Sequence, residues 1–298
     1  MSEMKIGMVG LDTSHVSGVP ADCFNLRFHL PGARIAKAFP GGSALFSLSR
    51  SRVGQFTSEL RGKYGVGIAG SIEELAGLDA YFLESVDGAQ HLEQFRQLAE
   101  FGKPVFVDKP LACSYADAKA IFELAREKGI PLMTASSMRF AAGVGDVLPA
   151  GAAVFAAEGF GPLAFLPDYR DYFWYGIHTA EIVYRYLGRG CEEVRSISGS
   201  GIELVTGRWK DGRIGQITGN SVGSGNFGVL LVTGEGHRVS VQNADIPYMF
   251  PMAAAILEFF RSGVSPVDPA ESLEIIAFLE AASRSRASGG KTVTLSEL

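Results

Sequence analysis

Short apolar runs alternate with amphipathic segments over the first 137 residues of the chain. Five runs have the length and composition of buried strands, at residues 5–10, 33–39, 80–86, 103–109 and 131–137. Strands that alternate with helices imply βαβ units and therefore a parallel sheet, whose ligands bind at the carboxyl ends of the strands. That edge would gather four polar segments, at residues 12–15, 40–43, 84–87 and 108–110.

Helix signals lie between these strands. Residues 52–65 predict a helix that ends at a glycine, and residues 89–102 carry apolar side chains at helical spacing. Ser114 caps a further predicted helix that runs to about residue 128. Two more helices are expected to begin near Ser14 and at Ser71, the latter because a glutamate follows at capping-box spacing.

The second half of the chain has a different pattern. A strand is predicted at 151–160 and a helix at 173–188, and several strand-like runs follow between 191 and 243. Glycine-rich turns separate these runs, and Asp211-Gly212 predicts a hairpin. The pattern indicates an open, mainly antiparallel sheet, followed by two helices at 251–263 and about 269–288.

The chain has 298 residues, which is enough for two domains. We predict an α/β fold with a parallel-sheet domain at 1–138 and a second domain at 139–298, which would bind substrate and form oligomers. The last helix is expected to pack back on the first domain.

Charge and cysteine content narrow the class of protein. The formal net charge is −5 and no basic face is visible, which argues against a general nucleic-acid binder. The three cysteines are scattered without a C-x-x-C pair, so no disulfide framework is expected and a reducing cytoplasm fits. The chain has neither a signal-peptide pattern nor an apolar run of about 18 residues, so no membrane span is expected.

Residues 91–140 resemble the Gfo/Idh/MocA family, named after glucose-fructose oxidoreductase and inositol dehydrogenase. His91 opens a helix, and the next strand ends in Asp108-Lys109-Pro110, where the family has Glu-Lys-Pro. The helix at 173–188 resembles the family segment with a second-domain histidine, here His178, and residues 266–295 resemble its closing helix and strand.

The resemblance implies an N-terminal Rossmann-type dinucleotide-binding domain and a C-terminal domain whose sheet often forms an oligomer interface. Many members oxidise or reduce a sugar, polyol or related carbonyl compound with NAD or NADP. Others use the bound cofactor for lyase-like or hydrolytic chemistry.

Two residues are candidates for catalysis by this resemblance. Lys109 would lie between nicotinamide and substrate, where its ammonium donates to the oxygen that changes redox state. The alternative is a surface lysine before a turn. His178 would assist in acid–base chemistry, although Trp174 stands where the family has an aspartate. The alternative for His178 is a packed helix histidine beside Tyr175.

The glycine loop departs from the G-x-G-x-x-G fingerprint. Gly10 keeps the first glycine, but Asp12 and His15 replace the second and third, and a carboxylate beside a pyrophosphate costs Coulomb energy. Thr13, Ser14 and the helix N-terminus still offer phosphate contacts. The residues expected to bind cofactor are Gly10, Leu11, Asp12, Thr13, Ser14, His15, Ser43, Ser85, Asp108 and Lys109.

The second strand lacks the acid that usually binds the ribose of NAD. Ser43, with Arg50 and Arg52 downstream, suits a 2′-phosphate, so the cofactor is NADP or NAD with the balance towards NADP. The alternative is a plain turn with exposed arginines.

Six polar residues at the expected ligand edge could hold a cation, namely Asp12, His15, Glu84, Asp87, His91 and Asp108. Their spacing matches no metal motif, so we predict no metal site and expect solvated or hydrogen-bonded acids. The residues expected to contact substrate are Lys109, Arg139, Trp174, Tyr175 and His178. For Arg139 the alternative is a structural salt bridge at the domain junction, and for the aromatics it is packing between sheet and helix.

These arguments predict an NAD(P)-dependent oxidoreductase that acts on a sugar, polyol or related small carbonyl compound and forms a homo-oligomer, either a dimer or a tetramer. A second hypothesis is a redox-inactive relative that binds a sugar-like ligand as a sensor or scaffold. A third is a lyase or hydrolase that uses a bound cofactor.

Overall fold

The computed structural model describes residues 3–16, 19–25, 30–149, 151–223 and 225–298. The chain forms two compact units: Met1–Ala135 with Met249–Pro269, and Ser136–Tyr248 with Ala270–Leu298. The first break in the chain therefore falls three residues before the predicted boundary. The segment that returns to the first unit contains the penultimate helix, whereas nearly all of the last helix belongs to the second unit.

The first unit is built on a six-stranded parallel sheet of order β3-β2-β1-β4-β5-β6. Its strands are β1 Met4–Val9, β2 Ala33–Phe39, β3 Gly67–Ile68, β4 Ala80–Leu83, β5 Val105–Val107 and β6 Leu132–Thr134. The strand order reverses between β1 and β4, and such a reversal opens a crevice at the carboxyl ends of the strands. The predicted parallel sheet is confirmed.

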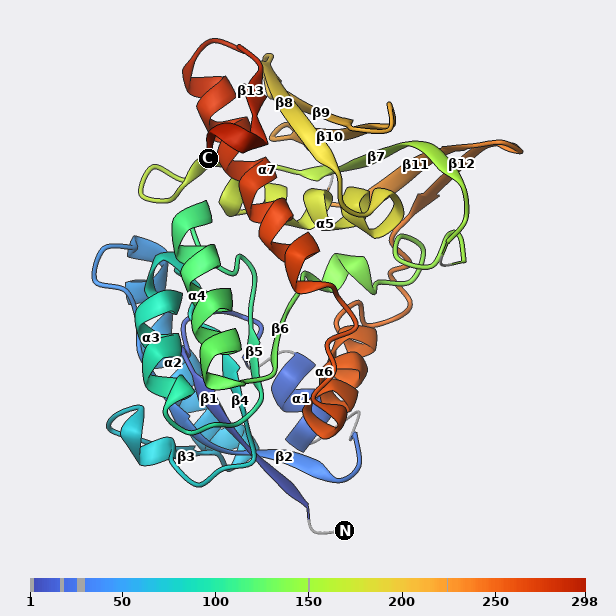
Figure 1. Cartoon of the computed structure of the whole chain (residues 1–298). Helices are drawn as coiled ribbons and strands as arrows, with labels where there is room; N and C mark the ends of the chain where they lie inside the picture. Colours follow the sequence, from blue (N-terminus) through green and yellow to red (C-terminus); the bar gives the residue numbers. More distant parts are fainter. Residues whose placement is uncertain (1–2, 17–18, 26–29, 150, 224) are drawn as a thin grey trace. The chain divides into compact units, whose positions relative to one another are not determined.

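Helices cover both faces of this sheet. They are α1 Val19–Asn25, α2 Ser47–Tyr64, α3 His91–Ala99, α4 Tyr115–Lys128 and α6 Phe250–Ser262, with 3₁₀ turns at Glu73–Leu75 and Gly88–Gln90. Consecutive strand residues point to opposite faces, so Tyr81 packs against Phe101 after α3, while Phe82 packs against Phe24 of α1 and Phe260 of α6. The helices are seen on either side of the sheet in Figure 1.

Of the four predicted helix ends described next, two are confirmed and two are wrong. Ser114 accepts a hydrogen bond from the amide of Asp117, and Gly65 ends α2 in the left-handed conformation, as predicted. The predicted helix start near Ser14 is wrong, because residues 13–16 form a bend and turn and α1 begins at Val19. The capping box at Ser71 is also wrong, because only a short 3₁₀ turn forms there, without a side-chain cap.

The second unit is built on a seven-stranded sheet of order β12-β11-β7-β10-β9-β8-β13. Its strands are β7 Val154–Pro162, β8 Cys191–Ser198, β9 Ile202–Trp209, β10 Ile214–Asn220, β11 Gly228–Thr233, β12 Gly236–Val241 and β13 Val293–Thr294. Only the β7–β10 pair is parallel, and Gly212 turns the predicted β9–β10 hairpin with a φ of 88°. The predicted mainly antiparallel sheet is confirmed.

Helices α5 (Gly176–Leu187) and α7 (Pro269–Ala287) cover one face of the second sheet (Figure 1). Gly207 and Gly215 are paired across β9 and β10, and a Cβ on them would meet Phe278 of α7 and Val183 of α5. Short 3₁₀ turns at Ser137–Arg139, Asp171–Phe173 and Leu295–Glu297 complete the unit.

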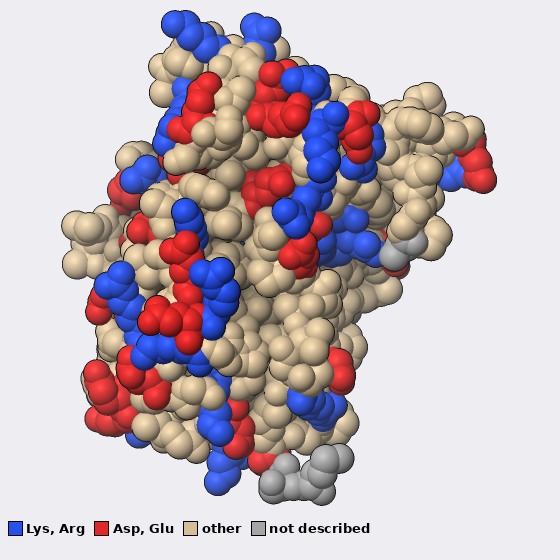
Figure 2. Space-filling model, viewed as in Figure 1, with Lys and Arg blue, Asp and Glu red and all other residues tan. Residues whose placement is uncertain are grey.

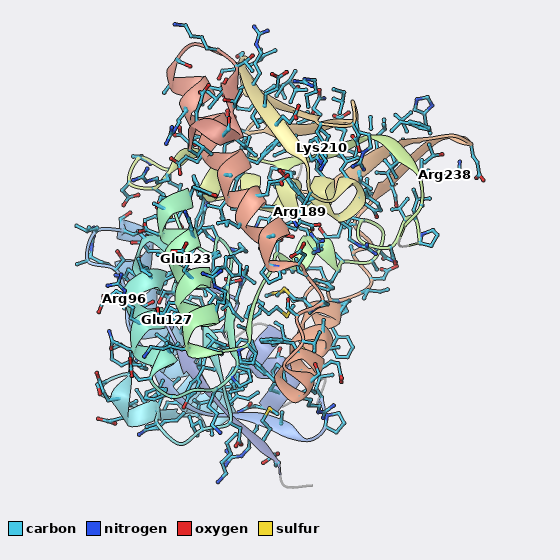
Figure 3. All side chains as sticks on the ribbon, viewed as in Figure 1. Arg96, Glu123, Glu127, Arg189, Lys210 and Arg238 are labelled. Atoms are coloured by element: carbon cyan, nitrogen blue, oxygen red, sulfur yellow. The ribbon has the colours of Figure 1, made fainter. Side chains whose placement is uncertain are left out.

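Charged side chains lie mostly on the outside of the molecule. On the face shown in Figure 2, acidic and basic residues are interspersed rather than gathered by sign. Figure 3 shows Arg96 of α3 and Glu123 and Glu127 of α4 among the exposed side chains of the first unit. Within the described residues, no helix combines the length and apolar character that a membrane span requires.

The aromatic cluster around Phe82 should dominate the stability of the first unit. Replacing Phe82 with Ala removes ring contacts to Phe24, Phe106 and Phe260, and should lower the free energy of unfolding by about 3–5 kcal/mol. Leu45→Ala is the control, since Leu45 is 86% exposed and its loss should change stability by less than about 0.5 kcal/mol. Urea denaturation measures both, and equal effects would show that the cluster is not a core.

Candidate functional site

The loop after β1 is held close to the end of β4. Gly10 has a φ of 88°, and a Cβ at this position would collide with the backbone of Ser85. The amides of Gly10 and Leu11 donate to the carbonyls of Phe39 and Pro40, so the same loop also follows the end of β2. Glycine is therefore required at the first position of the fingerprint for steric reasons.

Asp12, which replaces the second glycine, is turned into the protein. Its side chain is fully buried; Oδ2 accepts from the Ser49 hydroxyl at 2.6 Å, and Oδ1 accepts from the Val86 amide at 2.9 Å. Burial raises the pKa of Asp12 above its ordinary value, and these two hydrogen bonds oppose the rise. The carboxylate thus ties the loop to α2 and to the segment after β4.

His15, which replaces the third glycine, reaches the end of β5. Its Nδ1 lies 2.8 Å from Oδ2 of Asp108, and Asp108 is 2% exposed. Burial alone would raise the pKa of Asp108, but the positive charges of His15 and Lys109, with the His15 hydrogen bond, bring that pKa below its ordinary value. The pair therefore joins the loop after β1 to the predicted catalytic segment.

Glu84 shares this buried corner. Burial raises the pKa of Glu84 well above its ordinary value, the Asp108 carboxylate raises it further, and Lys109 opposes both. Oδ1 of Asp108 has no hydrogen-bond partner, although it is out of contact with solvent. Two carboxylates and one imidazole thus meet where β1, β4 and β5 end.

Ser43, the predicted contact for a 2′-phosphate, has hydrogen-bond partners within the protein. Ser43 donates from its hydroxyl to Oδ2 of Asp87 at 2.7 Å, and the same hydroxyl accepts from the amides of Leu45 and Phe46. A carboxylate this close is unfavourable for a phosphate. Arg50 donates to the carbonyl of Ala44. Ser43 and Arg50 thus have partners within the protein, and the preference for NADP over NAD stays a prediction.

His91 ties two loops together at the start of α3. Its Nε2 lies 2.8 Å from the carbonyl oxygen of Ser85, and its Nδ1 lies 3.1 Å from that of Leu111. The Ser85 hydroxyl is buried and has no hydrogen-bond partner.

Among the ten residues expected to bind cofactor, Ser14 is exposed, His15 is half-buried and the others are buried.

His178 of the second unit is packed and hydrogen-bonded. Its Nδ1 lies 2.7 Å from the Ser136 hydroxyl, which also accepts from the Met138 amide. The rings of Tyr175 and Phe227 lie 5.5 and 5.3 Å from the imidazole, centroid to centroid. Trp174 and Tyr175 are half-buried, and Tyr169 packs on Trp174. The structure thus shows the packing alternative for the aromatics; their contact with substrate stays a prediction.

Arg139 is held by two carboxylates of the second unit. Its guanidinium pairs with Oε2 of Glu181 at 3.1 Å and with Oε1 of Glu271. Burial would lower the pKa of Arg139, but the two carboxylates raise it. The structure thus shows a salt bridge whose three residues lie inside one unit, and contact of Arg139 with substrate stays a prediction.

Sequence reasoning missed four residues whose side chains bind predicted residues in these networks: Ser49, Ser136, Glu181 and Glu271. Ser49 and Ser136 are single hydroxyls far from their partners in the chain, and nothing in their surroundings marks them. Glu181 follows His178 at helical i,i+3 spacing, which could have indicated that the two share a face.

The buried carboxylate of Asp12 should make stability depend on pH. A raised pKa in the folded state gives stability that is present below the ordinary value near 3.8 and is lost as pH rises through the raised value. Asp12→Asn keeps the shape without the charge, so its stability relative to the natural chain should increase from about pH 4 to pH 7. Asp245→Asn, at an exposed carboxyl, is the control. Urea denaturation across this range checks the prediction, and parallel curves for Asp12→Asn and the natural chain would contradict it.

Sequence and structure comparisons point to one group of proteins. The model of an oxidoreductase family with an NAD-binding Rossmann fold, Gfo/Idh/MocA, matches residues 43–136. No curated protein matches the chain in sequence.

Three solved structures share the fold over nearly the whole of both chains. Myo-inositol 2-dehydrogenase from Lactobacillus plantarum is 13% identical, with a TM-score of 0.77 and coverage of 98% of this chain and 99% of the other. Myo-inositol dehydrogenase from Lactobacillus casei, solved with NAD(H) and myo-inositol, is 14% identical, with a TM-score of 0.74 and coverage of 98% and 96%. An oxidoreductase from Agrobacterium radiobacter, solved with NAD⁺, L-tartaric acid and magnesium, is 18% identical, with a TM-score of 0.75 and 99% coverage of both chains. Residues 43–136 therefore match the model of the Gfo/Idh/MocA oxidoreductase family, and the chain as a whole has the fold of these dehydrogenases.

Proposed function

We propose that the chain is an NAD(P)-dependent oxidoreductase that acts on a sugar, polyol or related small carbonyl compound. The observation that carries the proposal is the position of Lys109, which directly follows Asp108 at the end of β5 and is only 8% exposed. The family match covers this residue. No disulfide joins the three buried cysteines Cys23, Cys113 and Cys191, which agrees with a reducing compartment such as the cytoplasm.

The first unit fits a dinucleotide in its sheet and in its glycine loop. The strand order places a crevice at the ends of β1 and β4, and Gly10 keeps the loop close to β4. Asp12 points its carboxylate at Ser49 and Val86, which relieves the repulsion that its charge would exert on a pyrophosphate. The backbone of residues 10–15, with Ser43 and Ser85, would hold the cofactor, as NAD or NADP.

Lys109 is the group proposed to act on the substrate oxygen. The cofactor, when bound, supplies the chemistry of hydride transfer. The Lys109 ammonium lies in the field of the Glu84 and Asp108 carboxylates, since its charge acts on the pKa of both. From there it would donate a hydrogen bond or a proton to the oxygen as that atom changes charge. His178, oriented by Ser136, would assist at the substrate.

A redox-inactive binding protein is the second candidate. The observation that favours it is the pairing of His15 with Asp108. Because of this pair, a side chain of the phosphate loop is bound to a carboxylate at the end of β5. Such a protein would bind a sugar-like ligand without any nicotinamide requirement. A lyase or hydrolase with a tightly held cofactor would instead show nicotinamide absorbance after purification.

Cofactor binding and the role of Lys109 can be tested together. Saturation with NADH or NADPH at 100 times its dissociation constant should stabilise the chain by about 2.7 kcal/mol, a shift of several degrees. Lys109→Met should lower kcat/KM on a panel of sugars and polyols by about 10²–10⁴-fold, with a far smaller loss of cofactor affinity. Lys103→Met, an exposed lysine just before β5, is the matched control.

The outcomes separate the candidates. Neither a thermal shift nor a calorimetric signal with either cofactor, in protein free of bound nicotinamide, would reject the oxidoreductase in favour of the binding protein. Unchanged turnover in Lys109→Met would reject the mechanism while leaving the cofactor site in place.

We also propose that the chain forms a homo-oligomer through the open face of the second sheet. Strand register places on this face, opposite to α5 and α7, a row of side chains across five strands: Ile197, Leu204, Thr218, Phe160 and Val241. The neighbouring row includes Leu230 beside Val239, which is 65% exposed. Exposed apolar groups gathered in this way are typical of protein interfaces.

A charge in this face should dissociate the oligomer. Val239→Asp would place a carboxylate inside the proposed interface, so analytical ultracentrifugation at micromolar concentration should show a lower mass than for the natural chain, a dimer or tetramer. Val222→Asp is the control, because Val222 is similarly exposed but lies outside the strands. A natural chain that sediments as a monomer would contradict the proposal.

A further inference from the structure

Three side chains with metal-binding atoms converge in the first unit. His15 lies in the loop after β1, Glu84 directly follows β4, and Asp108 directly follows β5. One ligand atom from each lies within 4.8 Å of the other two. Among the residues that the structure describes, they are the one such group of histidine, cysteine or carboxylate side chains.

The other three polar residues of this edge have partners of their own. Asp12 accepts from Ser49 and from the Val86 amide, and Asp87 accepts from the Ser43 hydroxyl and the Ala89 amide. His91 faces two backbone carbonyls. The six candidates thus divide into three with structural partners and three that meet one another.

Asp108 supplies an independent sign that a ligand belongs here. Its Oδ1 is out of contact with solvent and has no hydrogen-bond donor, while Oδ2 faces His15. A buried acceptor in this state has lost its hydrogen bonds to water without gaining a partner in the protein, which is unfavourable. A cation bound at that side of the carboxylate would supply the missing partner.

Charge also favours a cation. Glu84 and Asp108 bring two carboxylates into a buried corner, where unpaired charges are costly. Lys109 and, in its protonated form, His15 supply the positive charges that act on Asp108. A divalent ion compensates both carboxylates at once, and the imidazole of His15 binds such an ion in its neutral form.

We propose that His15, Glu84 and Asp108 form a binding site for a divalent transition-metal ion of the Mn²⁺, Fe²⁺ or Zn²⁺ type. Carboxylates suit Mn²⁺, and an imidazole extends the range to Fe²⁺ and Zn²⁺. Neighbouring ligands of a six-coordinate ion with bonds near 2.1 Å lie about 3 Å apart. The 2.8 Å between His15 Nδ1 and Asp108 Oδ2 is already close to that value.

The site would leave coordination positions open. Three protein ligands satisfy only half of an octahedral ion, so water or an oxygen of a small molecule can complete it. Metal binding here requires neither the dinucleotide nor the second unit, so it stands or falls separately from the proposed oxidoreductase activity.

The test is a direct titration of chelator-treated protein with Mn²⁺, followed by electron paramagnetic resonance, and with Zn²⁺, followed by calorimetry. One ion per chain should bind. Glu84→Gln and Asp108→Asn keep the side-chain shape and should each weaken binding by at least about tenfold, since loss of an outer-shell partner alone costs that much. Asp87→Asn is the matched control, because it removes a neighbouring buried carboxylate outside the site and should bind as the natural chain does.

Each result supports or overturns the proposal. Failure of the natural chain to bind either ion would overturn it and leave a proton as the species that the two carboxylates share. Equal affinity in the Glu84→Gln variant, or loss confined to Asp87→Asn, would place any bound ion elsewhere and also overturn it. Circular dichroism of each variant ensures that only folded chains are compared, and the titration of the natural chain depends on no variant.

Discussion

Buried carboxylates follow β1, β4 and β5, and their need for partners determines how the loops at this edge of the first unit are arranged. β4 and β5 are apolar throughout, β1 is apolar from Ile6 onward, and a polar residue follows each strand within a few positions. A carboxylate in such a place has to find donors or a cation. Asp12 accepts a hydrogen bond from Ser49 of α2, and Asp87 accepts one from Ser43. The carboxylate of Asp108 pairs with the imidazole of His15. Hydrogen bonds to these carboxylates therefore connect the loops at this edge.

Much of the fold could be predicted from the sequence, because its signals are local. The run that begins at residue 80 forms the strand Ala80–Leu83, which is fully buried as a central strand of a parallel sheet requires, and the run at 33–39 forms a strand with buried and half-buried positions. Gly65 and Gly212 mark turns because each adopts a positive φ. Near Ser14 the local signal failed: the residues that looked like a helix start form a turn, with His15 drawn towards Asp108.

The site could be predicted only in part. Topology alone placed the loop at 12–15 and the segments at 84–87 and 108–110 on one edge, and the convergence of His15, Glu84 and Asp108 agrees with that expectation. The sequence could not show which side chains pair with one another. Asp12 and Ser49 are 37 residues apart, and Arg139 and Glu271 are 132 apart, so neither partner could be chosen by spacing. The fully buried state of Asp12 likewise depends on packing and not on its neighbours in the chain.

The replacement of glycines by Asp12 and His15 changes how the loop is held, and the second unit shows a parallel change. In the second unit Trp174 stands where the family resemblance leads us to expect an aspartate, and Nδ1 of His178 lies 2.7 Å from the hydroxyl of Ser136. A hydroxyl at this distance orients the imidazole. The nearby carboxylate of Glu181 is already paired with Arg139. In the proposed reaction Lys109 is the charged group at the substrate oxygen, and His178 is held in position by Ser136.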